Sequence, residues 1–432
     1  MDEDEKMEED SKDSEFKKPA KVKTKRTVYL PGLPMKKGEK LVFDPSAYHM
    51  LHEAQTGAPC LSFDIITDKL GDNRTLYPHT AYIVAGTQAD RPNKNNVIVI
   101  KASNLHEMKE ESDSEGGSES SDSESGGPSK TPKMNRMLIR HHGCVNRIRT
   151  AKVGDRTLAG VWSEMGKVTL LDLNPQLAEL DGPSLSKKSN PEPIRPLFVF
   201  NGHLGEGFGI DWCPTEPGVL ATGDCRKNIH VWRPQEGGWH VDQRPLVGHK
   251  ASVEDLQWSP NERHILASCS VDKSLRIWDT RQAGASACKL TVQDAHSSDI
   301  NVISWNKMEP LIASGGDDGY LYIWDLRNFK SGEAVATLKH HTSYVTTVEW
   351  SPHDHSVFAS GGADDQIAIW DLAVERDDSE ELSSELKDLP PQLLFIHQGQ
   401  EDIKELHWHK QIPGMIVSTA NSGFNFFRTI SV

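Results

Sequence analysis

Hydrophobic and polar residues alternate along short segments in the second half of the chain, which is typical of β-strands with one buried face. Between residues 248 and 372 the same arrangement occurs three times, as alternating runs separated by polar turns. One copy contains the runs VEDLQW, ILASCS and LRIWD, which are joined by turns at SPN and DK. The pattern predicts three short strands in each copy.

The copies share a fixed period. Their closing tryptophans stand 46 residues apart, and a histidine precedes each of them by 28 or 29 residues. These tryptophans are Trp232, Trp278, Trp324 and Trp370. A period of about 40 to 50 residues ending in Trp-Asp is the signature of WD repeats, whose four-stranded blades stack into a ring.

Weaker copies raise the number of expected blades to seven. The first blade is expected to have strands at 61–66, 81–86, 96–102 and 134–140. Two further units follow at 141–173 and 197–234, and the segment 174–196 between them is expected to be a loop rich in proline and serine. We therefore predict an all-β fold, a seven-bladed WD-repeat β-propeller with a disordered acidic N-terminal tail and acidic loops.

The last unit, from His397 to Phe426, ends before a fourth strand. An unpaired sheet edge exposes backbone groups, so a segment upstream of the first blade must complete this unit. The candidates are 27–31 and 44–56. The second candidate is compatible with a helix, because Asp44 and Pro45 are good helix-start residues, and also with a strand, because its side chains alternate. The sequence leaves this choice open.

The repeated polar residues are expected to form structural tetrads, each containing a histidine, a serine or threonine, an aspartate and a tryptophan. Such networks satisfy polar groups that the ring buries. In the unit at 197–234, Arg226 occupies the position of the aspartate. The expected tetrad residues are His203, Thr222, Trp232, His249, Ser268, Asp272, Trp278, His296, Ser314, Asp318, Trp324, His341, Ser360, Asp364 and Trp370.

The net charge of −15 is concentrated in a few segments. Residues 1–15 carry −7, residues 107–125 carry −7, and residues 375–388 carry −5, whereas residues 17–26 carry +6. Acidic tracts of this composition are usually solvated and disordered, and they can also hold a basic partner. We expect a tail at 1–40 and a propeller at 41–432, with acidic insertions at 107–130 and 375–392.

The basic run has three possible roles: nuclear import, contact with nucleic acid, or neutralisation of the neighbouring acids. Import is favoured, and direct nucleic-acid binding is not expected, because the chain shows no other basic face. The import residues are Lys17, Lys18, Lys21, Lys23, Lys25 and Arg26. Six cysteines without a CxxC pair suit a reducing compartment.

No motif of a hydrolase, a nucleotide-binding enzyme or a metalloprotease is present, and we expect no catalysis, metal or cofactor. The histidine pairs at 141–142 and 340–341 and the triplet at 407–409 are interpreted as structural. Ser112 and Ser121 are each followed three residues later by glutamate, a pattern that acid-directed kinases favour. We therefore expect phosphorylation at both serines.

Two segments carry a family resemblance. LPPQLLFIH at 389–397 resembles the proline-proline loop of the retinoblastoma-binding histone chaperones, and SAYHMLHEAQTGAPCLSFDIITD resembles the segment that leads into their first blade. With its acidic tail and serine-rich loop, the chain is similar over its whole length to the glutamate-rich WD-repeat family. In that family pattern, 46–53 closes the seventh blade.

The resemblance implies a nuclear and nucleolar chaperone that assists ribosome assembly and binds large-subunit ribosomal protein three and core histones. It leaves open a cytoplasmic pool and contact with pre-ribosomal particles. The family's long N-terminal helix has no counterpart in the Lys-, Pro- and Gly-rich region 17–42. Client binding is therefore assigned to an acidic loop, and the chain is expected to be a monomer. The acidic residues are Asp377, Asp378, Glu380, Glu381, Glu385 and Asp388.

Two other functions remain open. Arg281 and Arg327 follow their Trp-Asp pairs by two residues, which resembles the docking motif of substrate receptors for cullin ubiquitin ligases. A chromatin adaptor that binds histone tails without chaperoning them is the third possibility.

Overall fold

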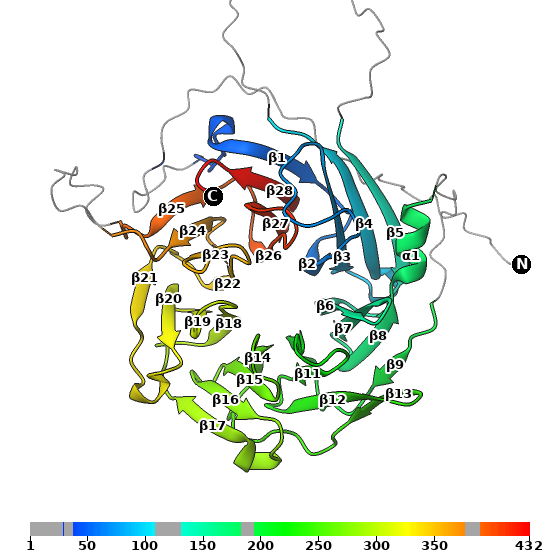
Figure 1. Ribbon diagram of the computed structural model, residues 1–432, viewed down its shortest axis with the longest axis vertical. Helices are drawn as coiled ribbons and strands as arrows, with labels where there is room; N and C mark the ends of the chain where they lie inside the picture. The colour runs from blue at the N-terminus through cyan, green and yellow to red at the C-terminus, as the bar shows by residue number, and fades with distance from the viewer. Residues whose placement is uncertain (1–28, 30–37, 109–130, 183–193, 376–388) are drawn as a thin grey trace, which may run out of the picture.

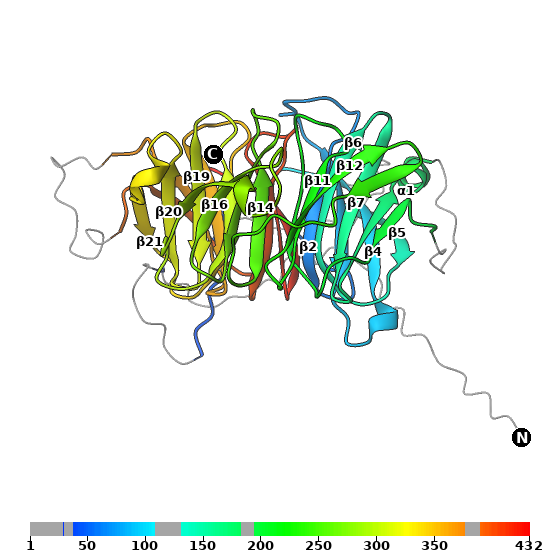
Figure 2. The same cartoon turned by 90° about the horizontal axis from the view of Figure 1, so that it is seen from below.

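The computed structural model describes residues 29, 38–108, 131–182, 194–375 and 389–432. In these residues the strands form seven four-stranded antiparallel sheets, arranged as blades around a central axis (Figures 1 and 2). The predicted seven-bladed WD-repeat propeller is confirmed. No helix of the described residues is long and apolar enough to cross a membrane.

Each blade is counted from its innermost strand outward. Blade 1 comprises β2 (Cys60–Ile66), β3 (His79–Thr87), β4 (Asn96–Leu105) and β5 (Lys133–Arg140). Blade 2 comprises β6 (Val145–Val153), β7 (Arg156–Ser163), β8 (Lys167–Asp172) and β9 (Phe198–Phe200). Blade 3 comprises β10 (Gly209–Trp212), β11 (Leu220–Gly223), β12 (Ile229–Gln235) and β13 (Gly238–Val241).

The remaining blades follow the same order. Blade 4 comprises β14 (Val253–Trp258), β15 (Ile265–Ser270), β16 (Leu275–Asp279) and β17 (Cys288–Val292). Blade 5 comprises β18 (Ile300–Trp305), β19 (Leu311–Gly316), β20 (Tyr320–Asp325) and β21 (Ala336–Lys339). Blade 6 comprises β22 (Val345–Trp350), β23 (Val357–Gly362), β24 (Ile367–Asp371) and β25 (Leu393–His397). Blade 7 comprises β26 (Ile403–Trp408), β27 (Met415–Ala420), β28 (Gly423–Thr429) and β1 (Tyr48–Ala54).

The repeat in the sequence is offset from the blade in space. The outermost strand of each blade lies at the start of the following sequence repeat, as β9 does: it pairs with β8 of blade 2 although it opens the unit at 197–234. Each sequence unit therefore links two blades covalently. The three alternating runs of the second half correspond to β14, β15 and β16 and to their equivalents in the next blades.

The expected loop at 174–196 is wrong at its beginning, where the helix α1 (Asn174–Leu180) forms. Leu173, Leu177 and Leu180 recur at helical spacing and pack in the cluster that contains Ile139 of β5 and Leu171 of β8. Pro175 is tolerated because the first helical turn needs no amide donor. The described ranges also contain the short 3₁₀ helices η1 (Pro45–Ala47), η2 (Pro92–Lys94), η3 (Gly284–Ala287) and η4 (Phe329–Ser331).

The ring closes through β1, which is the outermost strand of blade 7. This strand runs antiparallel to β28, with Leu51 opposite Phe427 and His52 opposite Phe426, and Figure 1 shows the blue strand beside the red one. Asp44 does cap a helical segment, but that segment is the single turn η1, and the strand begins at Tyr48. Closure by an upstream segment is therefore confirmed, and residues 48–54 form a strand.

Tyr48 anchors the closing strand in an aromatic cluster. Its ring packs edge-on against Phe43, Phe395 and Phe427, and its hydroxyl is hydrogen-bonded to Nδ1 of His397 at 2.8 Å. Burial lowers the pKa of His397 to about 3, so the imidazole stays neutral. The closure thus joins aromatic packing to one buried hydrogen bond between blades 6 and 7.

Truncation tests the closure. We expect deletion of residues 1–26 to leave the melting temperature nearly unchanged, because β1 and η1 remain. Deletion of residues 1–56 removes the outer strand of blade 7 and should lower it by roughly 10 °C or more, since each kcal/mol corresponds to about 2–4 °C in a large domain. Thermal unfolding followed by circular dichroism measures both. Equal melting temperatures would contradict the closure.

Candidate functional site

The seven innermost strands surround a central channel with a volume of about 630 Å³. Its wall contains carboxylates such as Asp64, Asp211 and Glu349 as well as the cations Arg147 and Arg149. Each innermost strand pairs with a neighbour on one edge only, so its other edge presents unpaired backbone groups toward the channel. These groups need partners from adjacent blades.

Side chains of one blade accept hydrogen bonds from backbone amides of the next. Asp211 accepts from the Trp258 amide at 2.8 Å, and Gln257 accepts from the Trp305 amide at 2.8 Å. Further side-chain acceptors of this kind are Ser62, Asp64, Asp255, Ser304, Thr347, Glu349 and Glu405. The polar residues that alternate along the inner strands thus hold neighbouring blades in register.

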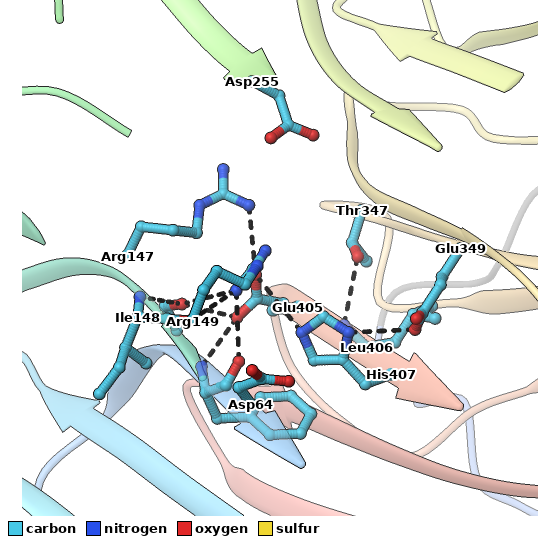
Figure 3. Close-up of polar contacts among 12 residues, drawn as sticks. Asp64, Arg147, Ile148, Arg149, Asp255, Thr347, Glu349, Glu405, Leu406 and His407 are labelled. Atoms are coloured by element: carbon cyan, nitrogen blue, oxygen red, sulfur yellow. Dashed lines mark hydrogen bonds and ion pairs between the residues drawn. The ribbon is translucent and has the colours of Figure 1, made fainter. Parts of the chain in front are cut away.

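Glu405 of β26 is the centre of the densest polar network (Figure 3). Its Oε1 accepts from Arg149 Nη2 at 2.6 Å and from Arg147 Nη1 at 3.2 Å, and both arginines lie on β6. Its Oε2 accepts from the Phe63 amide at 2.8 Å and from the Ser62 hydroxyl at 2.7 Å. One carboxylate therefore connects blade 7 to blade 1 and, across it, to blade 2.

His407 extends this network toward blade 6. Its Nδ1 lies 3.0 Å from Oε2 of Glu349, and its Nε2 lies 3.7 Å from Oε1 of Glu405 (Figure 3). Burial alone would lower the pKa of His407, but the two carboxylates outweigh it and raise the pKa to about 9. Although burial opposes it, Arg149 and His407 hold the pKa of Glu405 well below its usual range. At neutral pH the network is therefore ionised.

Asp211 has a different environment in the same channel. Burial raises the pKa of its carboxyl to about 7, against the opposing effect of the hydrogen bond that it accepts from the Trp258 amide. The channel therefore combines firmly ionised groups with one carboxyl that titrates near neutrality. The described residues contain no group of three or more His, Cys, Asp or Glu side chains that could hold a metal ion.

One mouth of the channel is acidic. The acids lie in the loops between the second and third strands of a blade, just before an innermost strand, or at its start, and so share one face, which we call the acidic face. Together they form the acidic rim: Glu206, Glu254, Asp299, Asp317, Asp365 and Asp402. Glu206 accepts from the Asn146 amide group at 3.0 Å, and Asp317 accepts from that of Asn301 at 2.8 Å.

The carboxylates of the acidic rim influence one another. Burial, followed by Asp299 and Asp255, raises the pKa of Glu254 against the pull of Arg147. Burial and then Asp317 raise the pKa of Asp299. Crowding of like charges is unfavourable without a cation nearby, so this rim is suited to accept one.

Asp402 shows the same deficit in a single side chain. Its Oδ2 is paired with Lys404 at 2.6 Å and accepts from Asn421 at 2.8 Å. Its buried Oδ1 has no hydrogen-bond partner within the described part of the chain. Buried carboxylate oxygens normally have partners, so this atom is a candidate acceptor for a bound donor.

The expected tetrads are assembled by hydrogen bonds in blades 3 to 6. In blade 4, His249 Nδ1 lies 3.0 Å from Asp272, and its Nε2 lies 2.6 Å from the Ser268 hydroxyl, which also accepts from the Trp278 indole. The equivalent bonds join His296 with Ser314 and Asp318, and His341 with Ser360 and Asp364. All three histidines are buried, which favours a structural role.

Blade 3 completes its tetrad with a residue that the repeat pattern does not indicate. Asp224 lies 2.9 Å from His203 Nδ1, and Thr222 bonds to both His203 and Trp232. Arg226 does occupy the usual aspartate position, but the turn supplies its carboxylate two residues earlier. A carboxylate inside the same tight turn was the available signal for this substitution.

The two arginines after the Trp-Asp pairs lie in loops between third and fourth strands, on the face opposite the acidic face. Arg281 forms two hydrogen bonds with Asp279, at 2.9 and 2.8 Å, and Arg327 does the same with Asp325 at 2.9 and 2.7 Å. Both side chains remain largely exposed. Each guanidinium is thus held in place by its own blade.

Several predicted residues lie outside the described residues. They are the import residues Lys17, Lys18, Lys21, Lys23, Lys25 and Arg26, the phosphorylation sites Ser112 and Ser121, and the loop acids Asp377, Asp378, Glu380, Glu381, Glu385 and Asp388. Their roles stay predictions. Sequence reasoning did not identify the acidic rim or the Glu405 network, although the polar positions of the inner strands were visible as alternation.

Comparison with known proteins identifies two family models. The model described as the histone-binding protein RBBP4, a component of the CAF1 complex, matches residues 38–106. The model described as WD domain, G-beta repeat, matches residues 241–279, 287–325 and 332–371. The first match covers η1 and the strands β1 to β4, and therefore the ring closure.

Three relatives resemble nearly the whole chain. Protein HEAT STRESS TOLERANT DWD 1 from Arabidopsis thaliana is 44% identical, over 94% of this chain and 92% of its own length. Ribosome assembly protein rrb1 from Schizosaccharomyces pombe is 41% identical, over 93% and 84% respectively. Glutamate-rich WD repeat-containing protein 1 from Dictyostelium discoideum is 43% identical, over 92% and 83%.

The Glu405 network can be tested by Glu405→Gln. The amide still accepts from Ser62 and Phe63 but leaves Arg147 and Arg149 without their anion. Removing one partner of a buried ion pair typically costs about 3–5 kcal/mol, so the free energy of unfolding should fall by that amount. Glu401→Gln is the matched control, because Glu401 pairs with Lys40 on the surface, where about 0–1 kcal/mol is at stake. Equal effects in urea titrations would contradict the assigned role.

The raised pKa of His407 predicts a pH dependence. Its stabilising contribution is fully present below the ordinary value of 6.5 and is lost as the pH rises through about 9. In His407→Gln, the loss of unfolding free energy relative to wild type should therefore be largest below pH 6.5 and shrink toward pH 9. Urea titrations at several pH values measure this difference. A constant difference across that range would contradict the ionised network.

Proposed function

The chain belongs to the glutamate-rich WD-repeat family, and from this premise we propose that it is a non-enzymatic chaperone or assembly adaptor for very basic proteins. Its clients are proposed to be large-subunit ribosomal protein three and core histones, in the nucleus and nucleolus. Two comparisons support this: one relative is a ribosome assembly protein, and one family model describes histone-binding proteins. The basic run at 17–26 supports nuclear import.

The observation that carries the proposal is the acidic rim around one mouth of the channel. Its carboxylates are spread over consecutive blades, and two of them have raised pKa values because burial and neighbouring acids disfavour their charge. A lysine or arginine side chain brought to this rim would relieve the repulsion. A ribosomal protein or a histone supplies such side chains at high density.

Two acidic insertions leave the ring close to the same strand. Met108, the last described residue before the insertion at 109–130, donates its amide to the His49 carbonyl at 2.8 Å. Phe395, which follows the insertion at 376–388, packs on Tyr48, and Met108 lies in the same apolar cluster. The proposed mechanism combines steering by these acidic tracts with fixed contacts on the acidic rim.

A second candidate function is a substrate receptor for a cullin ubiquitin ligase. The observation that favours it is the pair Arg281 and Arg327, both exposed and both oriented by their own aspartates. One relative also carries DWD in its printed name. Coprecipitation of the ligase's propeller adaptor, lost in Arg281→Ala with Arg327→Ala, distinguishes this function from client chaperoning, which needs neither arginine.

Client binding should depend on the acidic rim. In a rim variant, Glu206→Gln, Asp299→Asn and Asp317→Asn remove three carboxylates from the acidic face. Each exposed pair contributes about 0–1 kcal/mol, so the three changes together should weaken binding of a histone or of the ribosomal protein about tenfold. Fluorescence anisotropy at two salt concentrations measures this loss, which should diminish at higher salt.

Three variants serve as comparisons. Asp155→Asn, Glu262→Gln and Glu309→Gln remove equal charge from exposed loops of the opposite face and should leave affinity nearly unchanged. Reversal of the loop acids Asp377, Asp378, Glu380, Glu381 and Glu385 to lysine should weaken binding further than the same reversal of the tail acids Asp2, Glu3, Asp4, Glu5 and Glu8. Unchanged affinity in both the rim and the loop variants, or no salt dependence in the wild type, would contradict the proposed function.

A further inference from the structure

The face opposite the acidic face carries an unusual loop between β2 and β3, at residues 67–78. The corresponding connections are much shorter in blade 2, at 154–155, and in blade 7, at 409–414. In Figure 2 this blue loop projects from one edge of the ring. We call it the blade 1 loop.

The blade 1 loop is held in place by buried polar contacts. The Gln411 side chain accepts from the Asp68 amide at 2.8 Å and donates to the Asp68 carbonyl at 3.2 Å and to Asp72 at 3.0 Å. Arg74 pairs with Asp68 at 2.7 Å, and both side chains are largely buried. The conformation of the loop is therefore fixed by blade 7 and by its own ion pair.

A loop fixed in this way nevertheless exposes two large apolar side chains. Leu76 is 85% exposed and Leu70 is 56% exposed. Beside them lies a hollow of about 350 Å³, whose apolar wall is formed by Leu70, Leu76 and Pro78. The loop thus presents apolar surface that folding alone does not bury, a feature of binding surfaces.

The polar wall of the hollow has unsatisfied groups. His79 is 2% exposed, and its Nε2 has no hydrogen-bond partner among the described residues; the same is true of Arg74 Nε. Burial, with Arg428 and Arg74, lowers the pKa of His79 to about 4, so its ring is neutral. Such a wall suits a ligand group that accepts hydrogen bonds and carries negative charge.

Lysines extend this positive character along the face. Lys69 lies in the blade 1 loop, close enough to Lys152 of blade 2 to contribute, after burial, to the lowered pKa of that lysine. Lys410 adjoins Gln411 and contributes, after burial, to the lowered pKa of Lys307 at the same mouth of the channel. The nearby acids Asp68 and Asp72 are already engaged by Arg74 and Gln411.

We propose that this face docks an acidic peptide segment with apolar side chains, supplied by a partner protein other than the basic client. The apolar side chains would cover Leu70, Leu76 and Pro78, while carboxylates would face Arg74, Lys69 and Lys152. The charge of this face is opposite to that of the acidic rim. Because the two surfaces lie at opposite mouths of the channel, one ring can hold a basic client and an acidic partner together.

Binding of designed peptides to the full-length protein tests the proposal. The probe is a fluorescein-labelled peptide with leucines at helical spacing among glutamates; in one comparison peptide glutamine replaces glutamate, and in the other serine replaces leucine. The Glu-Leu peptide should bind, and both comparison peptides should bind at least about tenfold more weakly. No binding of the Glu-Leu peptide at its highest soluble concentration, or equal binding of either comparison peptide, would overturn the proposal.

Protein variants locate the site. Leu70→Ser with Leu76→Ser, and separately Lys69→Glu with Lys152→Glu, should each weaken the Glu-Leu peptide about tenfold without lowering the melting temperature. Leu204→Ser with Val335→Ser removes exposed apolar side chains elsewhere and should have no effect. Histone binding should be unchanged in the Leu70/Leu76 variant, so this test and the test of the proposed function can fail independently.

Other occupants have distinct results. Concentration-dependent self-association that disappears in the Leu70/Leu76 variant would identify a second copy of the chain as the occupant. Tight binding of single-stranded RNA that needs Lys69 and Lys152 but neither leucine would indicate a nucleic-acid surface. Peptide binding that is unaffected by the Leu70/Leu76 change would place the peptide elsewhere. Each of these outcomes would overturn the proposal.

Discussion

The structure depends on how the inner edges of seven strands are satisfied. Each innermost strand has one edge without a neighbouring strand, and around a closed ring all these edges face one narrow channel. The next blade supplies the missing partners as side chains, for example Asp211 for the Trp258 amide and Glu405 for the Phe63 amide. The spacing of the blades, the polarity of the channel and its need for Arg147 and Arg149 all follow from this single requirement.

The same requirement separates the two faces of the ring. Arg147 and Arg149 extend from β6 to Glu405, so the network lies across the channel between its two mouths (Figure 3). The loops at one mouth carry the acidic rim, whereas lysines and the blade 1 loop lie at the other. A protein built in this way has two chemically different surfaces on one rigid ring, which suits an adaptor better than a single deep pocket would.

The sequence predicts what is repeated and what is local. The period of the tryptophans defines the blades, and the unfinished last unit requires a closing strand, because both follow from contacts that recur in every copy. Features that occur once were missed or left open: α1, the carboxylate of Asp224 in place of one at Arg226, and the start of β1 at Tyr48. The Glu405 network joins residues more than 250 positions apart, as in Arg149 and Glu405, and no local pattern records such a pairing.

Closure by β1 also has a consequence for synthesis. The strand leaves the ribosome among the first structured segments, but its partner β28 is among the last to be made. During translation the completed blades are an open arc with a free strand at one end, and unpaired strands of this kind invite wrong pairing. A chain that stalls before Gly423 has seven inner strands but no closed ring. For this protein, ring formation is therefore an event at the end of translation, and a nascent-chain factor that shields β1 until then would protect the whole fold.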